Sequence, residues 1–146
     1  MPMGRYRLRE NFLSILVAAL VCVALERVWI VLFMKHWLSG MGHDHAWLSG
    51  QHLSGWLLYV VALLAAVLIA ATLEVFTRLT GTQTAKRGIE VSVALWLGLV
   101  MTTQATEFVF ERGAYSLFAI NAGFWLIGFM VMGAIVGGWN KAGDRE

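Results

Sequence analysis

The sequence predicts an all-α integral membrane protein, a four-helix bundle built from two transmembrane hairpins. Two observations on composition point to this class. Hydrophobic residues make up 59% of the 146 residues and charged residues only 14%, and mean hydropathy is +0.70. Soluble domains average about 45–50% apolar and about 25% charged residues. A third observation is that the apolar residues gather in four runs, each long enough to cross a bilayer.

The four runs cover residues 12–34, 53–76, 89–110 and 115–139. About 20 apolar residues in an α-helix cross a hydrocarbon core of about 30 Å, and lipid offers no hydrogen-bond partner to other backbone conformations. The first run follows a basic start, as in a signal peptide, but apolar sequence resumes after Arg27 and no small-residue cleavage site appears. We therefore expect one transmembrane domain over residues 1–146, with an outer loop at 35–52.

Lys and Arg residues are unevenly divided between the two sides of the predicted bundle. Eight of the eleven lie near the N-terminus, between the second and third spans, or in the C-terminal tail. Only Lys35 and Arg112 lie on the opposite side. Because basic residues favour cytoplasmic segments, the sequence predicts that both termini are cytoplasmic. The expected location is the cell (inner) membrane, as a multi-pass protein.

Small residues recur at four-residue spacing in three of the spans. Lipid provides no hydrophobic reason for helices to associate, so lines of small residues indicate close helix packing. The predicted packing residues are Ala18, Cys22, Ala62, Ala66, Ala70, Gly133 and Gly137. This spacing does not distinguish contacts within one chain from contacts with another copy or another protein.

Ionisable and amide side chains inside the spans form a second pattern. A charge within a span costs roughly 2.5–3.5 kcal/mol on insertion scales, so it calls for a partner or a function. Counting from the span ends at 1.5 Å per residue places five polar residues from three helices in one outer-leaflet layer. The predicted intramembrane network is Glu26, Arg27, Gln104, Glu107 and Asn121, with Glu111 at its surface end.

This network has two interpretations. Arg27 would pair with Glu107 or Glu26, and the polar contacts would then lock the bundle. Alternatively, the carboxylate left over would serve an ion, proton or substrate site. Glu74 lies four residues before Arg78 near the other end of the second span, and we expect this pair to be structural.

All four His residues lie in the outer loop. Imidazole suits zinc and copper, which makes the loop a candidate metal site. Its candidate ligands are His36, His43, Asp44, His45 and His52. Their spacing matches no established ligand pattern, and the alternative is a polar loop at the membrane interface. No other cofactor is evident.

Several function classes are disfavoured by the sequence. A dispersed net charge of +2 does not suggest nucleic-acid binding. The common phosphate-binding, zinc-protease and nucleophile motifs do not occur, so no catalytic residue is predicted and an enzyme is not favoured. The expected partners are the lipid bilayer and either further copies of the chain or a membrane complex.

The second half of the chain carries a family resemblance. The segments 96–98, 110–113 and 117–125 are similar to the small four-helix membrane family known as domain of unknown function 1761. The resemblance covers residues 11–140. It implies the four-helix architecture and implies no activity, because the family has none established. On this pattern the positions of interest are Glu111, Asn121 and Trp125.

These features support three hypotheses about function. The sequence favours a structural or accessory subunit that packs against itself or a larger membrane complex. The first alternative is a small homo-oligomeric transporter or channel that uses the outer-leaflet polar layer, because two carboxylates, Glu26 and Glu107, face a single Arg27. The second alternative is an outward-facing metal or pH sensor that uses the His-rich loop.

Overall fold

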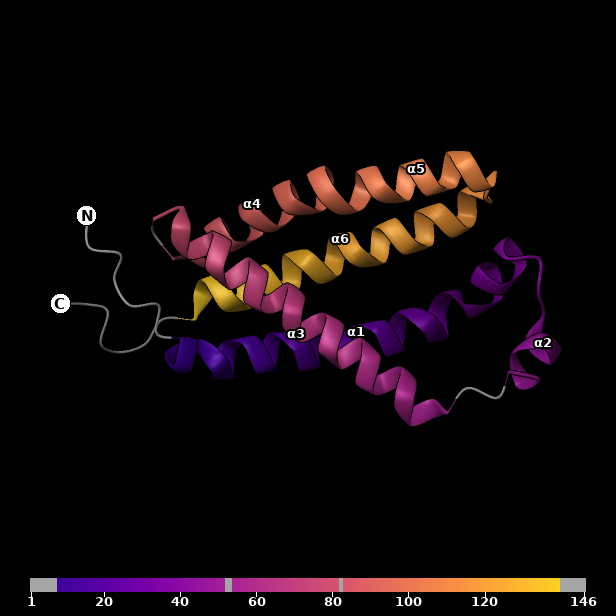
Figure 1. The fold of residues 1–146 in the computed structure, drawn as a ribbon, viewed down its shortest axis with the longest axis horizontal. Coiled ribbons are helices and arrows are strands. Elements are labelled where there is room, and N and C mark those ends of the chain that lie inside the picture. Colours follow the sequence, from indigo (N-terminus) through magenta and orange to yellow (C-terminus); the bar gives the residue numbers. More distant parts are fainter. Residues whose placement is uncertain (1–7, 52–53, 82, 140–146) are drawn as a thin grey trace.

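The computed structural model describes residues 8–51, 54–81 and 83–139, with side chains from residue 12. The helices in chain order are α1 (Leu8–Gly40), α2 (His45–Ser49), α3 (Gly55–Leu79), α4 (Ala85–Leu95), the π-helix η1 (Trp96–Met101), α5 (Thr102–Glu111) and α6 (Tyr115–Gly138). α4, η1 and α5 form one continuous rod (Figure 1). Four segments of the described chain are long and apolar enough to cross a membrane, which confirms the predicted all-α four-helix fold.

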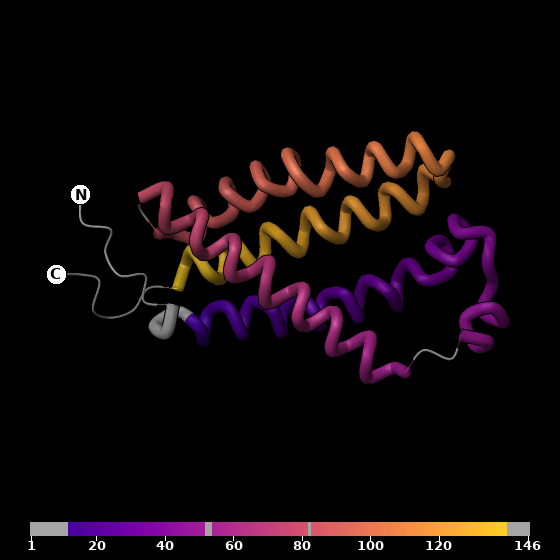
Figure 2. The backbone as a smooth tube through the Cα atoms, in the orientation of Figure 1, coloured from indigo at the N-terminus to yellow at the C-terminus, as the bar shows by residue number. Residues whose placement is uncertain are grey.

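The four long helices alternate in direction along the bundle (Figure 1). The start of α1, the α3–α4 connection and the end of α6 lie together at what we call the α3–α4 end. The α1–α3 connection and the α5–α6 turn lie at the α5–α6 end. α3 crosses the other helices obliquely and packs on α1, α6 and α4 (Figure 2).

α6 is the central helix, because α1, α3 and the α4–α5 rod all pack against it. Three side chains from other segments donate hydrogen bonds to its carbonyl groups. Trp29 Nε1 lies 3.2 Å from the Ile120 oxygen, and Trp96 Nε1 lies 3.2 Å from the Ala122 oxygen. Gln83 Nε2 lies 2.9 Å from the oxygen of Val136. These donors tie α6 to its neighbours at both ends.

Glycine residues allow α4 and α6 to approach until their backbones touch. A Cβ atom added at Gly133 would lie 2.5 Å from the carbonyl oxygen of Gly88 and even closer to Ser92 Oγ. A Cβ added at Gly88 would collide with the carbonyl of Gly133, and one at Gly137 would lie 3.0 Å from the Cα of Gly88. Only glycine therefore fits at this crossing.

The predicted small-residue lines lie inside the chain's own core. Six of the seven predicted packing residues are buried, namely Ala18, Cys22, Ala66, Ala70, Gly133 and Gly137, and Ala62 is half-buried. The spacing did not identify Gly88 and Ser92, which pack against Gly133 from α4. The glycine pair of α6 is thus occupied within the chain and is not free for a second subunit.

Two of the differences between the predicted and the observed helix boundaries have a clear physical cause. The first helix continues past residue 34 to Gly40, because Leu38 is still buried against the bundle. The chain turns away just after the helix, where Gly42 adopts a left-handed φ of 75°. The rod of the third span begins at Ala85, where the Thr84 side chain accepts a hydrogen bond from the Arg87 backbone N–H at 3.1 Å. The predicted outer loop at 35–52 is partly helical, because α1 continues to Gly40 and α2 covers His45–Ser49.

Candidate functional site

A π-helical turn divides the rod of the third span. Hydroxyl groups at its end bond back into the wide turn: Thr102 Oγ1 donates to the Gly98 oxygen and Thr103 Oγ1 donates to the Leu99 oxygen, both at 2.8 Å. A π turn adds a residue to the helical repeat and rotates the helix that follows it. Ser92 faces α6 before the turn, and Gln104 and Phe108 are turned inward after it.

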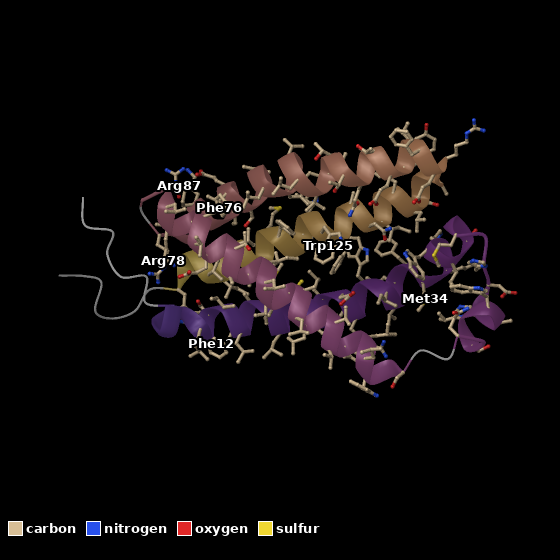
Figure 3. The ribbon with its side chains drawn as sticks, viewed as in Figure 1. Phe12, Met34, Phe76, Arg78, Arg87 and Trp125 are labelled. Atoms are coloured by element: carbon tan, nitrogen blue, oxygen red, sulfur yellow. The ribbon has the colours of Figure 1, made fainter. Side chains whose placement is uncertain are left out.

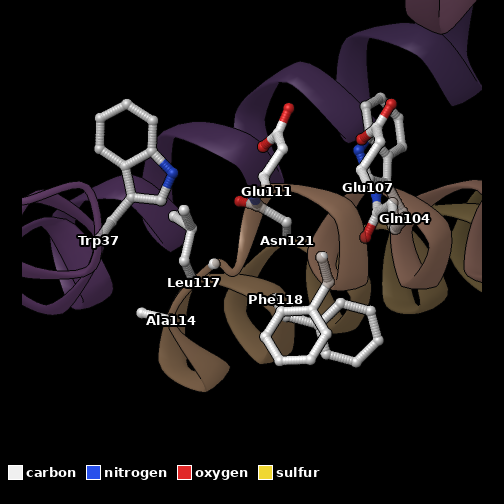
Figure 4. A pocket seen from close by; sticks show the side chains of 11 residues that line it. Trp37, Gln104, Glu107, Glu111, Ala114, Leu117, Phe118 and Asn121 are labelled. Carbon is white, nitrogen blue, oxygen red and sulfur yellow. The ribbon is translucent and has the colours of Figure 1, made fainter.

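Beyond this turn, a cavity of about 320 Å³ lies between α5, α6 and the end of α1. Its lining residues are Trp37, Gln104, Glu107, Phe108, Glu111, Gly113, Ala114, Leu117, Phe118, Asn121 and Trp125 (Figure 4). The cavity lies at the α5–α6 end of the bundle. We refer to it below as the α5–α6 cavity.

Four polar side chains meet at the α5–α6 cavity. Gln104, Glu107 and Glu111 come from α5, and Asn121 comes from α6. The two carboxylates extend toward the same side of the cavity, beside the two amide groups (Figure 4). The Oε1 atom of Gln104 is buried and has no hydrogen-bond partner among the described residues. A buried acceptor without a donor costs about 1–3 kcal/mol, so the folded chain retains it at a cost.

Aromatic rings form much of the remaining wall. Trp37 comes from α1, Phe108 from α5, and Phe118 and Trp125 from α6. The rings of Phe108 and Phe118 lie 5.2 Å apart between centroids. Trp125 had been singled out by the family resemblance, whereas the other three had not. Their signal in the sequence is weak, because aromatic residues are common near any membrane interface.

Comparison with known families gives one match, over residues 13–137, to the family model described as "Protein of unknown function (DUF1761)". The chain belongs to this family. The matched region includes every residue that lines the α5–α6 cavity. Neither the comparison with curated proteins nor that with solved structures gave a significant match.

The DUF1761 chain does not bring the whole predicted polar network together. Gln104, Glu107, Asn121 and Glu111 share the α5–α6 cavity, but Glu26 and Arg27 are not among its lining residues. The Cζ atom of Arg27 lies 5.5 Å from the centroid of the Tyr59 ring on α3. The predicted pairing of Arg27 with a carboxylate is not among the ion pairs of the described residues. Depth along the membrane axis had suggested one layer, but Arg27 lies on the side of α1 that meets α3.

The outer loop forms local contacts in the structure. The rings of His43 and Trp47 stack with centroids 4.0 Å apart and an interplanar angle of 4°. Asp44 caps α2 by accepting a hydrogen bond of 2.9 Å from the Trp47 backbone N–H. His36 and His45 are exposed, and His52 lies outside the described residues. In the described part of the chain, no three His, Cys, Asp or Glu side chains are grouped as metal ligands would be.

The pair at the opposite end of α3 is formed as predicted. Arg78 Nε contacts Glu74 Oε1, and Glu74 is only 3% exposed. Arg78 and Arg87 lie at the α3–α4 end, whereas Met34 lies toward the other end (Figure 3). The ion pair therefore stabilises the end of the bundle that is remote from the cavity.

Proposed function

We propose that this chain is a multi-pass membrane protein that binds a small ligand in the α5–α6 cavity. The observation that carries the proposal is the convergence of four polar side chains and four aromatic rings on one cavity. Ligand sites range from about 300 to 1,000 Å³ and combine apolar walls with a few placed polar groups. Polar residues within membrane spans are costly and commonly mark such sites.

The packing of the bundle supports binding at one end of the chain in preference to conduction through it. At the α3–α4 end, α4 and α6 touch at Gly88 and Gly133, and Met132 and Val136 are fully buried. A ligand would therefore enter and leave the cavity at the α5–α6 end. Transport across the membrane would require several copies of the chain or a rearrangement of its helices.

Thermal unfolding of the purified protein in lipid nanodiscs tests this proposal. A ligand that binds only the folded chain raises the unfolding temperature in a concentration-dependent manner. A library of small polar compounds should contain stabilisers whose effect disappears in the cavity-filling variant Asn121→Leu. The effect should persist in Glu90→Gln, because Glu90 lies on α4 and pairs with Arg87. Stabilisation that survives Asn121→Leu, or a library without any stabiliser, would contradict the proposal.

We further propose that the α5–α6 end faces away from the cytoplasm, in the inner membrane of the cell. The support is the excess of Lys and Arg toward the α3–α4 end, where Arg78 and Arg87 lie (Figure 3). Cysteine labelling tests this orientation, because the native Cys22 is buried. A membrane-impermeant maleimide should label Ser116→Cys in intact cells and should not label Thr80→Cys. The reverse pattern would contradict the orientation.

A role as an accessory subunit is a second candidate, and a different observation favours it. Every residue from Ser54 to Val61, at the start of α3, is exposed on the isolated chain, including Trp56 at 68%. Lipid, a second copy or another membrane protein would cover this segment in the bilayer. Native mass spectrometry after release in mild detergent distinguishes these cases. A stoichiometric second subunit supports the accessory role, a homo-oligomer supports self-assembly, and a monomer contradicts both.

A further inference from the structure

The charge of the α5–α6 cavity indicates the sign of its ligand. Glu107 and Glu111 contribute two carboxylates. None of the lining residues, all of which lie in the described part of the chain, is Lys, Arg or His. Neither carboxylate forms an ion pair within the described residues. Both residues are exposed, and the negative potential of the two carboxylates favours a cation and disfavours an anion in the cavity.

The walls of the cavity favour an organic cation over a metal ion. Hard metal cations take six or more oxygen ligands, or a compact set of carboxylates and imidazoles. In the described part of the chain, no three His, Cys, Asp or Glu side chains are grouped in this way, and the cavity itself has two carboxylates. Instead, the rings of Trp37, Phe118 and Trp125 line the cavity. Aromatic rings attract alkylammonium groups through their negative faces and also accept the attached carbon chain.

The unpartnered amide oxygen narrows the class further. Gln104 Oε1 is buried beside the cavity without a hydrogen-bond donor in the described residues. A quaternary ammonium group has no N–H to offer, whereas a primary ammonium group has three. When the Gln104 amide turns toward the cavity, a primary ammonium would satisfy its oxygen and still reach a carboxylate.

We propose that the α5–α6 cavity binds a small primary alkylammonium group, an inference that rests on the proposed ligand-binding function. The nitrogen is held by the carboxylates of Glu107 and Glu111, and the Gln104 amide joins them by turning its oxygen, which is buried in the structure, toward the cavity. The alkyl part lies against the rings of Trp37 and Phe118. The ammonium group belongs either to a free amine or to the headgroup of a phosphatidylethanolamine molecule from the surrounding bilayer.

A set of matched compounds tests the ligand class. The protein is placed in nanodiscs of phosphatidylglycerol, which lacks an ammonium group, and its unfolding temperature is measured against concentration at constant ionic strength. The probes are propylammonium chloride, 1-propanol, sodium propionate and calcium chloride. We expect propylammonium alone to stabilise the protein saturably. Each of Glu107→Gln and Glu111→Gln should weaken its binding by about tenfold, since each removes one charge-assisted contact. Glu90→Gln is the matched control and should leave binding unchanged.

The outcomes separate this proposal from the broader one. If propanol, propionate or calcium binds instead and the effect is lost in Asn121→Leu, the ammonium proposal is overturned while the cavity remains a binding site. If none of the four probes and no library compound stabilises the protein, both proposals fail. Propylammonium binding that is unchanged in both Glu variants would place the amine elsewhere and overturn this inference.

A second nanodisc experiment identifies the source of the ammonium group. Replacing phosphatidylglycerol with phosphatidylethanolamine supplies the headgroup at high local concentration. If the headgroup occupies the cavity, the protein becomes more stable and propylammonium binding weakens, and both effects disappear in Glu107→Gln. If propylammonium binding is the same in both lipids, a free amine is the ligand.

Discussion

The two halves of α6 pack differently against the rod formed by α4, η1 and α5: one half is in close contact with it, and the other half borders a cavity. Toward the α3–α4 end, Gly133 and Gly137 bring the helix into backbone contact with Gly88. Toward the α5–α6 end, Asn121 and Trp125 face a cavity of about 320 Å³. Glycine removes the side chain that separates two helices, whereas aromatic and amide side chains hold helices apart. One helix pair thereby combines a rigid crossing with an open site.

The π turn of η1 lies between these two regions. Before it, α4 presents Gly88 and Ser92 to α6, and after it α5 presents Gln104 and Phe108 to the cavity. The Trp96 indole, at the first residue of the π turn, donates a hydrogen bond to the Ala122 oxygen. The change in packing therefore occurs where the helical register of the rod changes. The hydrogen bond from Trp96 fixes this part of the rod against α6.

The largest effect is expected from adding a methyl group at the close crossing. Gly133→Ala should destabilise the protein by about 3 kcal/mol or more, because the obstacles include the backbone of Gly88, which cannot rotate away. The measurement is unfolding in mixed micelles with increasing sodium dodecyl sulfate. Gly55→Ala is the control, since an added Cβ there meets no atom within 4 Å. A cost below about 1 kcal/mol for Gly133→Ala would argue against backbone contact at this crossing.

A smaller loss is expected at the π turn. Trp96→Phe removes the donor to the Ala122 oxygen and should cost about 1 kcal/mol from the hydrogen bond, with a further cost from the smaller ring. The same unfolding assay measures it. Trp56→Phe is the matched control, because Trp56 is 68% exposed. Equal effects of the two substitutions would mean that the indole bond does not pin the register.

Replacing each of two glutamines by leucine should change the stability of the protein in opposite directions in the two regions. Gln104→Leu should raise stability by about 1 kcal/mol, because it removes a buried acceptor that lacks a donor among the described residues. Gln83→Leu should lower stability by about 1 kcal/mol, because Gln83 donates to the Val136 oxygen at 2.9 Å. Unfolding free energies of the two variants decide the question. A loss of stability in both would show that the Gln104 amide is satisfied in the membrane.

The smallest effect is expected on the exposed face of α4. Glu90 pairs with Arg87 at 3.0 Å and with Lys86 at 3.9 Å, and its side chain is about half exposed. Glu90→Gln should change stability by less than about 0.5 kcal/mol, because exposed ion pairs contribute little. Unfolding at low and high salt checks this expectation. A larger loss that salt does not reduce would show that this face is shielded from water, for example by a partner.

The sequence located parts of both regions and missed others for definite reasons. The four-residue spacing identified Gly133 and Gly137, but Gly88 lies just before the predicted start of the third span at residue 89. Counting depth identified Gln104, Glu107 and Asn121 as one layer, and these residues of α5 and α6 do share the cavity. The same counting added Glu26 and Arg27, because depth carries no information about which side of a helix a residue occupies.

Composition and hydrophobic runs by themselves determined that this protein has four helices long and apolar enough to span a membrane, because that property depends on the apolar length of each segment. The spacing of small residues likewise determined where close packing is allowed. Only the tertiary structure decided that Gly133 packs on Gly88 within the chain and that Arg27 lies beside Tyr59. The cavity also depends on the tertiary structure, because the rotation of each helix and the π turn set which side chains face each other. Helix rotation is fixed by contacts between segments distant in sequence, such as that of Trp96 with Ala122.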